Sequence, residues 1–86
     1  MNGTGPVEIN GGVVYAYFTE DERGGLSARL SADEWERLGL HAGQWVRVRF
    51  PGQDVVELLL TAVSPAPPVV WLTLLSPAAV SARRVG

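Results

Sequence analysis

The sequence predicts a mainly β domain with one short helix near its middle. Three observations support this prediction. β-Forming residues flank an Asn-Gly pair near the N-terminus, apolar and polar residues alternate after residue 44, and one segment between them has helix start and stop signals. Because 86 residues leave room for one domain, we expect residues 1–86 to form a single unit, with flexible ends at 1–5 and 85–86.

The first predicted feature is a hairpin, with strands at 7–9 and 13–18 around the Asn-Gly-Gly sequence at 10–12. Asn and Gly both accept the positive φ angles of a tight turn, so this pair between β-formers is a strong hairpin signal. The acidic and glycine-containing segment 20–25 is expected to be a solvated loop. Residues 26–30 then form a short strand.

The helix is predicted at 31–38. Ser31 is followed three residues later by Glu34, which is the spacing of a capping box. Trp35 lies one turn into the helix, and Gly39 fits the left-handed position that ends it. A helix of two turns does not persist alone, so packing must stabilise it.

Two antiparallel strands are predicted at 45–50 and 55–63, on either side of a Pro-Gly-containing turn. Both segments alternate between apolar and other residues, so each has one face for the core. Matching the apolar faces places Arg49 opposite Glu57, and a slip by one residue would bury the glutamate.

The C-terminal third is apolar, and residues 58–82 include no charged side chain. That length could span a bilayer as a helix, but the proline-rich segment at 64–68 breaks it. We therefore expect a loop at 64–68, a central or interface strand at 69–75, and no membrane span. The Ser-Pro pair at 76–77 is typical of a helix start, so 78–84 form a short C-terminal helix or a disordered tail.

The segment LSADEWERLGLHAGQWVRV at 30–48 resembles the strand, short helix and "LGL-x-x-G-x-x-V-x-V" element of the cradle-loop barrels. That group includes double-psi β-barrels and swapped-hairpin, AbrB-type DNA-binding domains. The resemblance extends over about 26–75 and implies a small five- or six-stranded β-barrel, double-psi-like, around one short central helix. Two departures stand out: Gln44 replaces the usual acidic residue, and no final strand follows the second helix. The barrel is therefore expected to close incompletely, or with a second copy. An SH3-like or OB-like barrel is the alternative.

Composition and motifs exclude most catalytic chemistry. The chain has no cysteine, so thiolate metal sites, cysteine nucleophiles and disulfides are excluded. His41 is the only histidine and has no neighbouring ligand set, and the serines have no base partner in the sequence pattern. We expect no enzyme activity, no cofactor and no metal. The start of the chain has no secretory signal, so a cytoplasmic location is expected.

The candidate site is the non-core face of the strand at 45–50. Trp and Arg side chains dominate interface hot spots, and a charged fraction of only 19% together with three tryptophans suggests a covered surface. The candidate partner-binding residues are Trp45, Arg47, Arg49 and Leu59 at this face, and Trp71 in the apolar strand at 69–75. The alternative for this face is purely structural, with Arg49 paired to Glu57.

Two functions follow. The first is a non-enzymatic module that binds itself as a homodimer or binds another protein. The second is an AbrB-like DNA-binding regulator or antitoxin, although a net charge of −2 provides no general attraction to nucleic acid. Its candidate nucleic-acid contacts are Arg23, Arg29, Arg47 and Arg49, where Arg23 and Arg29 extend the arginine surface if the intervening loop folds over.

Overall fold

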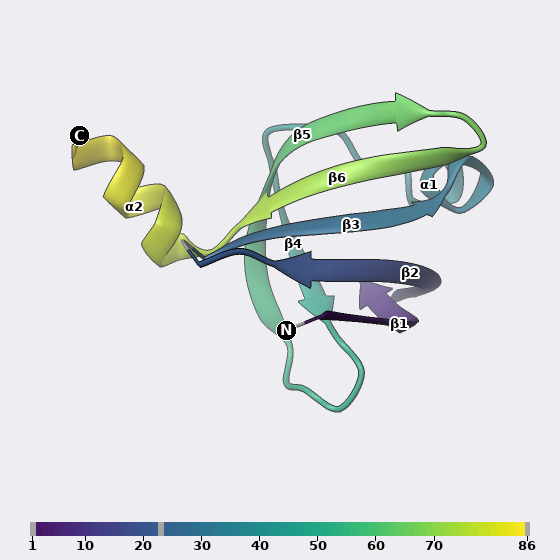
Figure 1. Ribbon diagram of the computed structural model, residues 1–86, viewed down its shortest axis with the longest axis horizontal. Coiled ribbons are helices and arrows are strands. Elements are labelled where there is room, and N and C mark those ends of the chain that lie inside the picture. The colour runs from purple at the N-terminus through teal and green to yellow at the C-terminus, as the bar shows by residue number, and fades with distance from the viewer. Residues whose placement is uncertain (1, 23, 86) are drawn as a thin grey trace.

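The computed structural model describes residues 2–22 and 24–85, with side chains up to residue 81 in the last helix, and shows a closed six-stranded antiparallel barrel (Figure 1). The strands are β1 (Asn2–Ile9), β2 (Gly12–Glu20), β3 (Gly25–Ser31), β4 (Gln44–Arg49), β5 (Val56–Ala66) and β6 (Val69–Leu75), and the helices are α1 (Ala32–Leu38) and α2 (Pro77–Val85). Around the barrel the strand order is β1-β2-β3-β6-β5-β4, and β4 pairs back with β1. The predicted mainly β barrel with a short central helix and a short C-terminal helix is confirmed.

The barrel closes within one chain. β1 pairs with β4 at Glu8 and Ile9, and the ladder continues into the turn, where the Asn10 backbone N–H donates to the Arg47 carbonyl over 2.8 Å. The expectation of incomplete closure, or closure by a second copy, is therefore wrong. β1 and β4 are far apart in sequence, and no local pattern revealed that they meet.

The core is the barrel interior, filled by alternate side chains of all six strands. Its most deeply buried large members are Val7, Val46, Val48, Leu60, Leu72 and Leu74. No polar or charged residue is buried among the residues that the structure describes. The predicted alternation in 45–50 is confirmed, so the other face of β4 is available to solvent.

The N-terminal hairpin has the predicted turn, with φ angles of 51° at Asn10 and 85° at Gly11. However, β1 begins at Asn2, so residues 2–5, expected to be flexible, pair with the end of β2. Gly3 contributes to this pairing, because a Cβ there would lie 3.0 Å from the Phe18 ring. The small residue leaves room for Phe18 over β1.

Helix α1 has the predicted caps. The Ser31 hydroxyl accepts the Glu34 backbone N–H over 3.1 Å, and Gly39 ends the helix at a φ of 65°. Trp35 packs partly buried against the core. The Glu34 carboxylate accepts the Ser31 hydroxyl over 3.1 Å and the Tyr15 backbone N–H over 2.9 Å. Glu34 therefore links α1 to the part of β2 that does not pair with β3.

The register of β4 and β5 differs from the prediction by two residues, and Glu57 lies opposite Arg47 instead of Arg49. A shift of two residues keeps every side chain on its predicted face. It arises because Phe50 leaves the ladder and turns inward, where its ring lies 5.0 Å from that of Phe18. The connecting loop is longer than the turn expected from its Pro-Gly sequence.

The alternation of β5 is interrupted by a bulge between Leu60 and Ala62. The Thr61 hydroxyl donates to the Thr73 carbonyl over 3.2 Å at this point. One extra residue reverses the faces that follow it. Ala62, which the alternation predicted for 55–63 places on the same face as Leu60, is therefore exposed, and Val63 packs against the core.

The segment expected to be a loop at 64–68 is mostly strand. β5 continues to Ala66, and Pro67-Pro68, joined by a cis peptide bond, turn the chain into β6. Pro65 lacks a backbone N–H, but β4 pairs only with the first half of β5, so the second half has one neighbouring strand.

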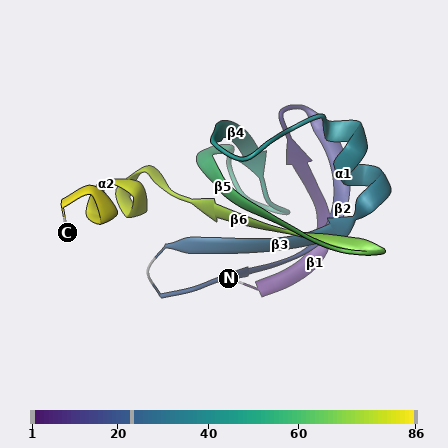
Figure 2. The same ribbon diagram turned by 90° about the horizontal axis from the view of Figure 1, so that it is seen from above.

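Helix α2 begins as predicted, with the Ser76 hydroxyl accepting the Ala79 backbone N–H over 3.1 Å. Figures 1 and 2 show that it projects from the end of the barrel, and Ala79 in its first turn is buried there. Neither helix in the described parts of the chain is long and apolar enough to cross a membrane.

Candidate functional site

The outward side chains of β4, of the start of β5 and of Val55 just before β5 form one surface, which we call the β4 wall. Its members are Trp45, Arg47, Arg49, Val55, Glu57 and Leu59. They are brought together by strand alternation and by the observed register, in which Trp45 lies opposite Leu59 and Arg47 opposite Glu57. Four of the five predicted partner-binding residues therefore lie on one surface.

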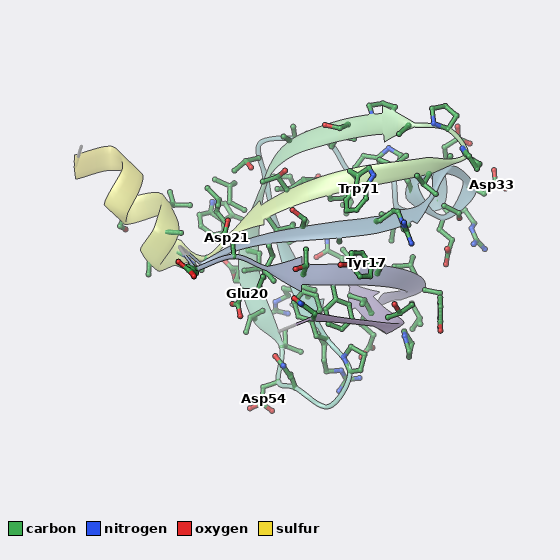
Figure 3. All side chains as sticks on the ribbon, in the orientation of Figure 1. Tyr17, Glu20, Asp21, Asp33, Asp54 and Trp71 are labelled. Atoms are coloured by element: carbon green, nitrogen blue, oxygen red, sulfur yellow. The ribbon has the colours of Figure 1, made fainter. Side chains whose placement is uncertain are left out.

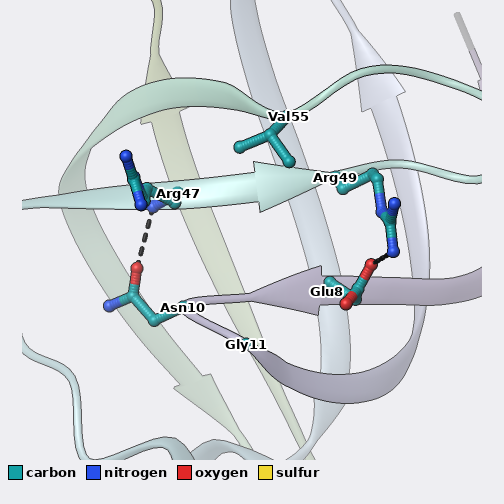
Figure 4. A pocket seen from close by; sticks show the side chains of 6 residues that line it. All are labelled: Glu8, Asn10, Gly11, Arg47, Arg49 and Val55. Carbon is teal, nitrogen blue, oxygen red and sulfur yellow. Dashed lines mark hydrogen bonds and ion pairs between the residues drawn. The ribbon is translucent and has the colours of Figure 1, made fainter.

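Arg49 is held at the edge of the β4 wall by an ion pair with Glu8 of β1 (Figure 4). Both side chains are partly exposed, so the pair contributes little to stability. Its effect is to orient the Arg49 guanidinium toward β1. The expected pairing of Arg49 with Glu57 is wrong, because the two-residue shift in register places Arg47 beside that glutamate.

The backbone of Arg47 is fixed, whereas its side chain extends toward solvent. The Arg47 backbone N–H donates to the Asn10 side-chain carbonyl over 2.8 Å, as Figure 4 shows. Among the side chains of residues 2–22 and 24–81, no ion pair involves the Arg47 guanidinium or the Glu57 carboxylate. A hollow of about 570 Å³ lies beside Arg47, lined by Glu8, Asn10, Gly11, Arg47, Arg49 and Val55.

Large apolar side chains on the β4 wall are exposed. Trp45 is 43% exposed and Val55 is 57% exposed. Val13, opposite Glu8 in the β1–β2 ladder, extends this apolar surface at 64% exposure. Isolated exposed apolar residues are normal, but aromatic and aliphatic groups beside an arginine are typical of interfaces.

The charges of this region balance. Arg47 and Arg49 lie beside Glu57 and Glu8, so two positive charges accompany two negative ones. A surface that binds the nucleic-acid backbone needs several unpaired cations to replace counterions. The arrangement suits a mixed polar and apolar protein partner better than a polyanion.

Trp71, also predicted as a partner-binding residue, lies on a different surface. It is on β6, and it faces Arg29 of β3 in the ladder. β3 lies across the barrel from β4, three strands away in either direction. Arg29 therefore does not extend the arginine surface of β4, contrary to expectation, and Arg23 lies outside the described residues.

Arg29 instead forms what we call the aromatic–arginine cluster, with Tyr17 of β2 and Trp71. Its guanidinium carbon lies 5.3 Å from the Tyr17 ring centre and 5.6 Å from that of Trp71. The two rings are 6.2 Å apart and nearly perpendicular, and Figure 3 shows both on the same side of the barrel. Sequence reasoning missed Tyr17, because only the pairing of β2, β3 and β6 places it beside Arg29.

No group of three or more His, Cys, Asp or Glu side chains that could hold a metal ion occurs in the described part of the chain. His41 lies exposed in the loop after α1, with its Nδ1 atom 3.2 Å from the Ala42 carbonyl oxygen. It is part of neither surface.

Comparisons with models of protein families, with curated proteins and with solved structures found no match to this chain.

Proposed function

We propose that the protein is a non-enzymatic assembly module that forms a homodimer through the β4 wall. The observation that carries this proposal is the juxtaposition of Arg47 and Glu57. The two lie side by side on the outer surface, without an ion pair in the described structure, and are flanked by exposed Trp45 and Val55.

Such a surface is complementary to itself. In a two-fold symmetric interface, if residue i of one copy contacts residue j of the other, j of the first also contacts i of the second. Neighbouring opposite charges satisfy this requirement, because Arg47 of each copy can meet Glu57 of the other. Trp45 and Val55 then supply the apolar area that drives association.

Binding to a different protein uses the same residue types and is an outcome of the test below. The DNA-binding regulator is the second candidate function, supported by the sequence resemblance to cradle-loop barrels. Part of that resemblance has a structural counterpart, since Gly39 and Gly43 have φ angles of 65° and 93° between α1 and β4. The charges of the β4 wall, which balance when Glu8 of β1 is counted with them, favour the assembly module.

Sedimentation velocity over a range of protein concentrations tests the homodimer. We expect the wild type to sediment as a dimer and Arg47→Glu to sediment as a monomer, because the variant places like charges across the interface. Glu57→Arg should have the same effect, and the double variant should restore the dimer. Arg37→Glu, a matched charge reversal on the exposed face of α1, should leave it unchanged.

A wild-type protein that is monomeric at every concentration would contradict the homodimer. The DNA alternative is tested separately, by fluorescence anisotropy of a labelled mixed-sequence duplex at low and moderate salt. Salt-sensitive binding that Arg47→Glu abolishes would favour the regulator.

A further inference from the structure

We infer that the aromatic–arginine cluster is a second binding site, which takes a carboxylate carried by a segment of another protein. Arg29 is exposed, and no carboxylate in the described residues forms an ion pair with it. Its two aromatic neighbours contact the guanidinium at 5.3 and 5.6 Å. The cluster lies across the barrel from the β4 wall, so this inference does not depend on the homodimer.

The two rings hold the arginine in place before any ligand arrives. Contacts with Tyr17 and Trp71, each partly buried on its own strand, restrict the long Arg29 side chain. A guanidinium that is already ordered loses less rotamer freedom when it binds. Its planar set of N–H donors matches the two oxygens of a carboxylate.

In the described structure, the strand positions that flank the cluster carry no charged side chain. The outward side chains nearest to it along β1, β2, β3, β5 and β6 are Thr4, Thr19, Ser27, Ser64 and Thr73. A single cation among uncharged strand side chains, with the Glu34 carboxylate at the edge of the adjoining hollow and a net chain charge of −2, suits one carboxylate and does not suit the repeated phosphates of a nucleic acid.

A hollow of about 260 Å³ adjoins Arg29 and can receive a neighbouring apolar side chain of the ligand. It forms where β2 and β3 diverge, and Tyr15, Tyr17 and Val69 contribute to its lining. Tyr15 is 64% exposed. The nearby Glu34 carboxylate is already engaged by the Tyr15 backbone N–H and the Ser31 hydroxyl. The site therefore fits a peptide in which one acidic residue, or the terminal carboxylate, lies next to an apolar residue.

The test is selection of a random-peptide display library on the wild-type protein, with affinities of the recovered peptides measured by fluorescence anisotropy. We expect the recovered peptides to combine a carboxylate with an adjacent apolar residue. Replacing that carboxylate by its amide should weaken binding to the wild-type protein roughly tenfold or more, because a charge-assisted hydrogen-bonded pair is lost. Arg29→Gln should show the same loss, and Arg47→Gln, the matched change on the β4 wall, should bind like the wild type.

The indole N–H signal of Trp71 in ¹⁵N spectra locates the bound peptide, and it should shift while that of Trp45 does not. The inference is overturned if no peptide is recovered, or if the amide peptide binds as tightly as the acid. It is also overturned if the peptide shifts Trp45 alone. A single-stranded oligonucleotide that shifts Trp71 and loses affinity in Arg29→Gln would assign the site to nucleic acid instead.

Discussion

The contact between α1 and β2 depends on one carboxylate, and removing it gives the sharpest stability prediction. Glu34→Ala deletes the acceptor of the Tyr15 backbone N–H, at 2.9 Å, and of the Ser31 hydroxyl, at 3.1 Å. Hydrogen bonds to charged groups contribute about 1.5–3 kcal/mol. Tyr15 is exposed, so water can replace part of the lost contact, and we expect the free energy of unfolding to fall by about 1–2 kcal/mol.

Urea unfolding of Glu34→Ala beside Glu36→Ala isolates this contribution. Glu36 lies on the same helix with an exposed side chain, so its replacement changes charge and helix propensity alike but leaves the contact with β2 intact. With a urea m-value of about 1 kcal/mol/M, the midpoint of Glu34→Ala should lie about 1–2 M lower. The Tyr15 amide should also exchange its hydrogen faster. Equal midpoints for the two variants, together with unchanged exchange at Tyr15, would refute the reasoning.

Two further changes test the fold by urea unfolding. Leu60→Ala should destabilise the protein by about 3–5 kcal/mol, because Leu60 is fully buried and its loss leaves a cavity in the barrel. Leu59→Ala, on the outer face of β5, should cost less. Similar losses of stability for both variants would contradict the assigned faces of β5. Gly11→Ala should cost about 1 kcal/mol, because Gly11 has a φ angle of 85° and a Cβ there is strained without meeting any neighbour. An unchanged midpoint for Gly11→Ala would argue against the tight turn between β1 and β2.

The sequence predicted the features that depend on contacts between nearby residues. The turn at Asn10 and Gly11, and the helix between Ser31 and Gly39, are determined by backbone preferences and by side chains within one turn. The alternation of β4 is likewise local, and it correctly placed Trp45 on the outside.

The features that depend on distant segments were missed. The pairing of β1 with β4 closes the barrel, and the pairing of β3 with β6 places Arg29 beside Trp71. Both pairings join strands that are distant in the sequence, and the hydrophobic periodicity of a strand does not indicate which distant strand it pairs with. The predicted register between β4 and β5 was also wrong. Phe50 leaves the ladder and packs in the core, and this makes the loop between the two strands longer.

The candidate site was predicted in part for the same reason. Trp45, Arg47 and Arg49 share a face because they alternate along one strand, so the sequence identified them together. Trp71 was predicted as a partner-binding residue because the strand at 69–75 is apolar on both faces, and the strand order separates it from the other three. Residue types indicate which side chains bind partners, whereas topology decides which of them act together.

In the proposed homodimer the β4 wall is covered, and the indole N–H signals of the three tryptophans test this directly. Trp45 lies on the β4 wall, Trp71 in the aromatic–arginine cluster, and Trp35 on α1, packed against the core. On dilution of the ¹⁵N-labelled protein, we expect the Trp45 signal to move as the dimer dissociates, while the Trp35 and Trp71 signals stay in place. A stationary Trp45 signal at every concentration, or movement of Trp71 without Trp45, would contradict the proposed interface.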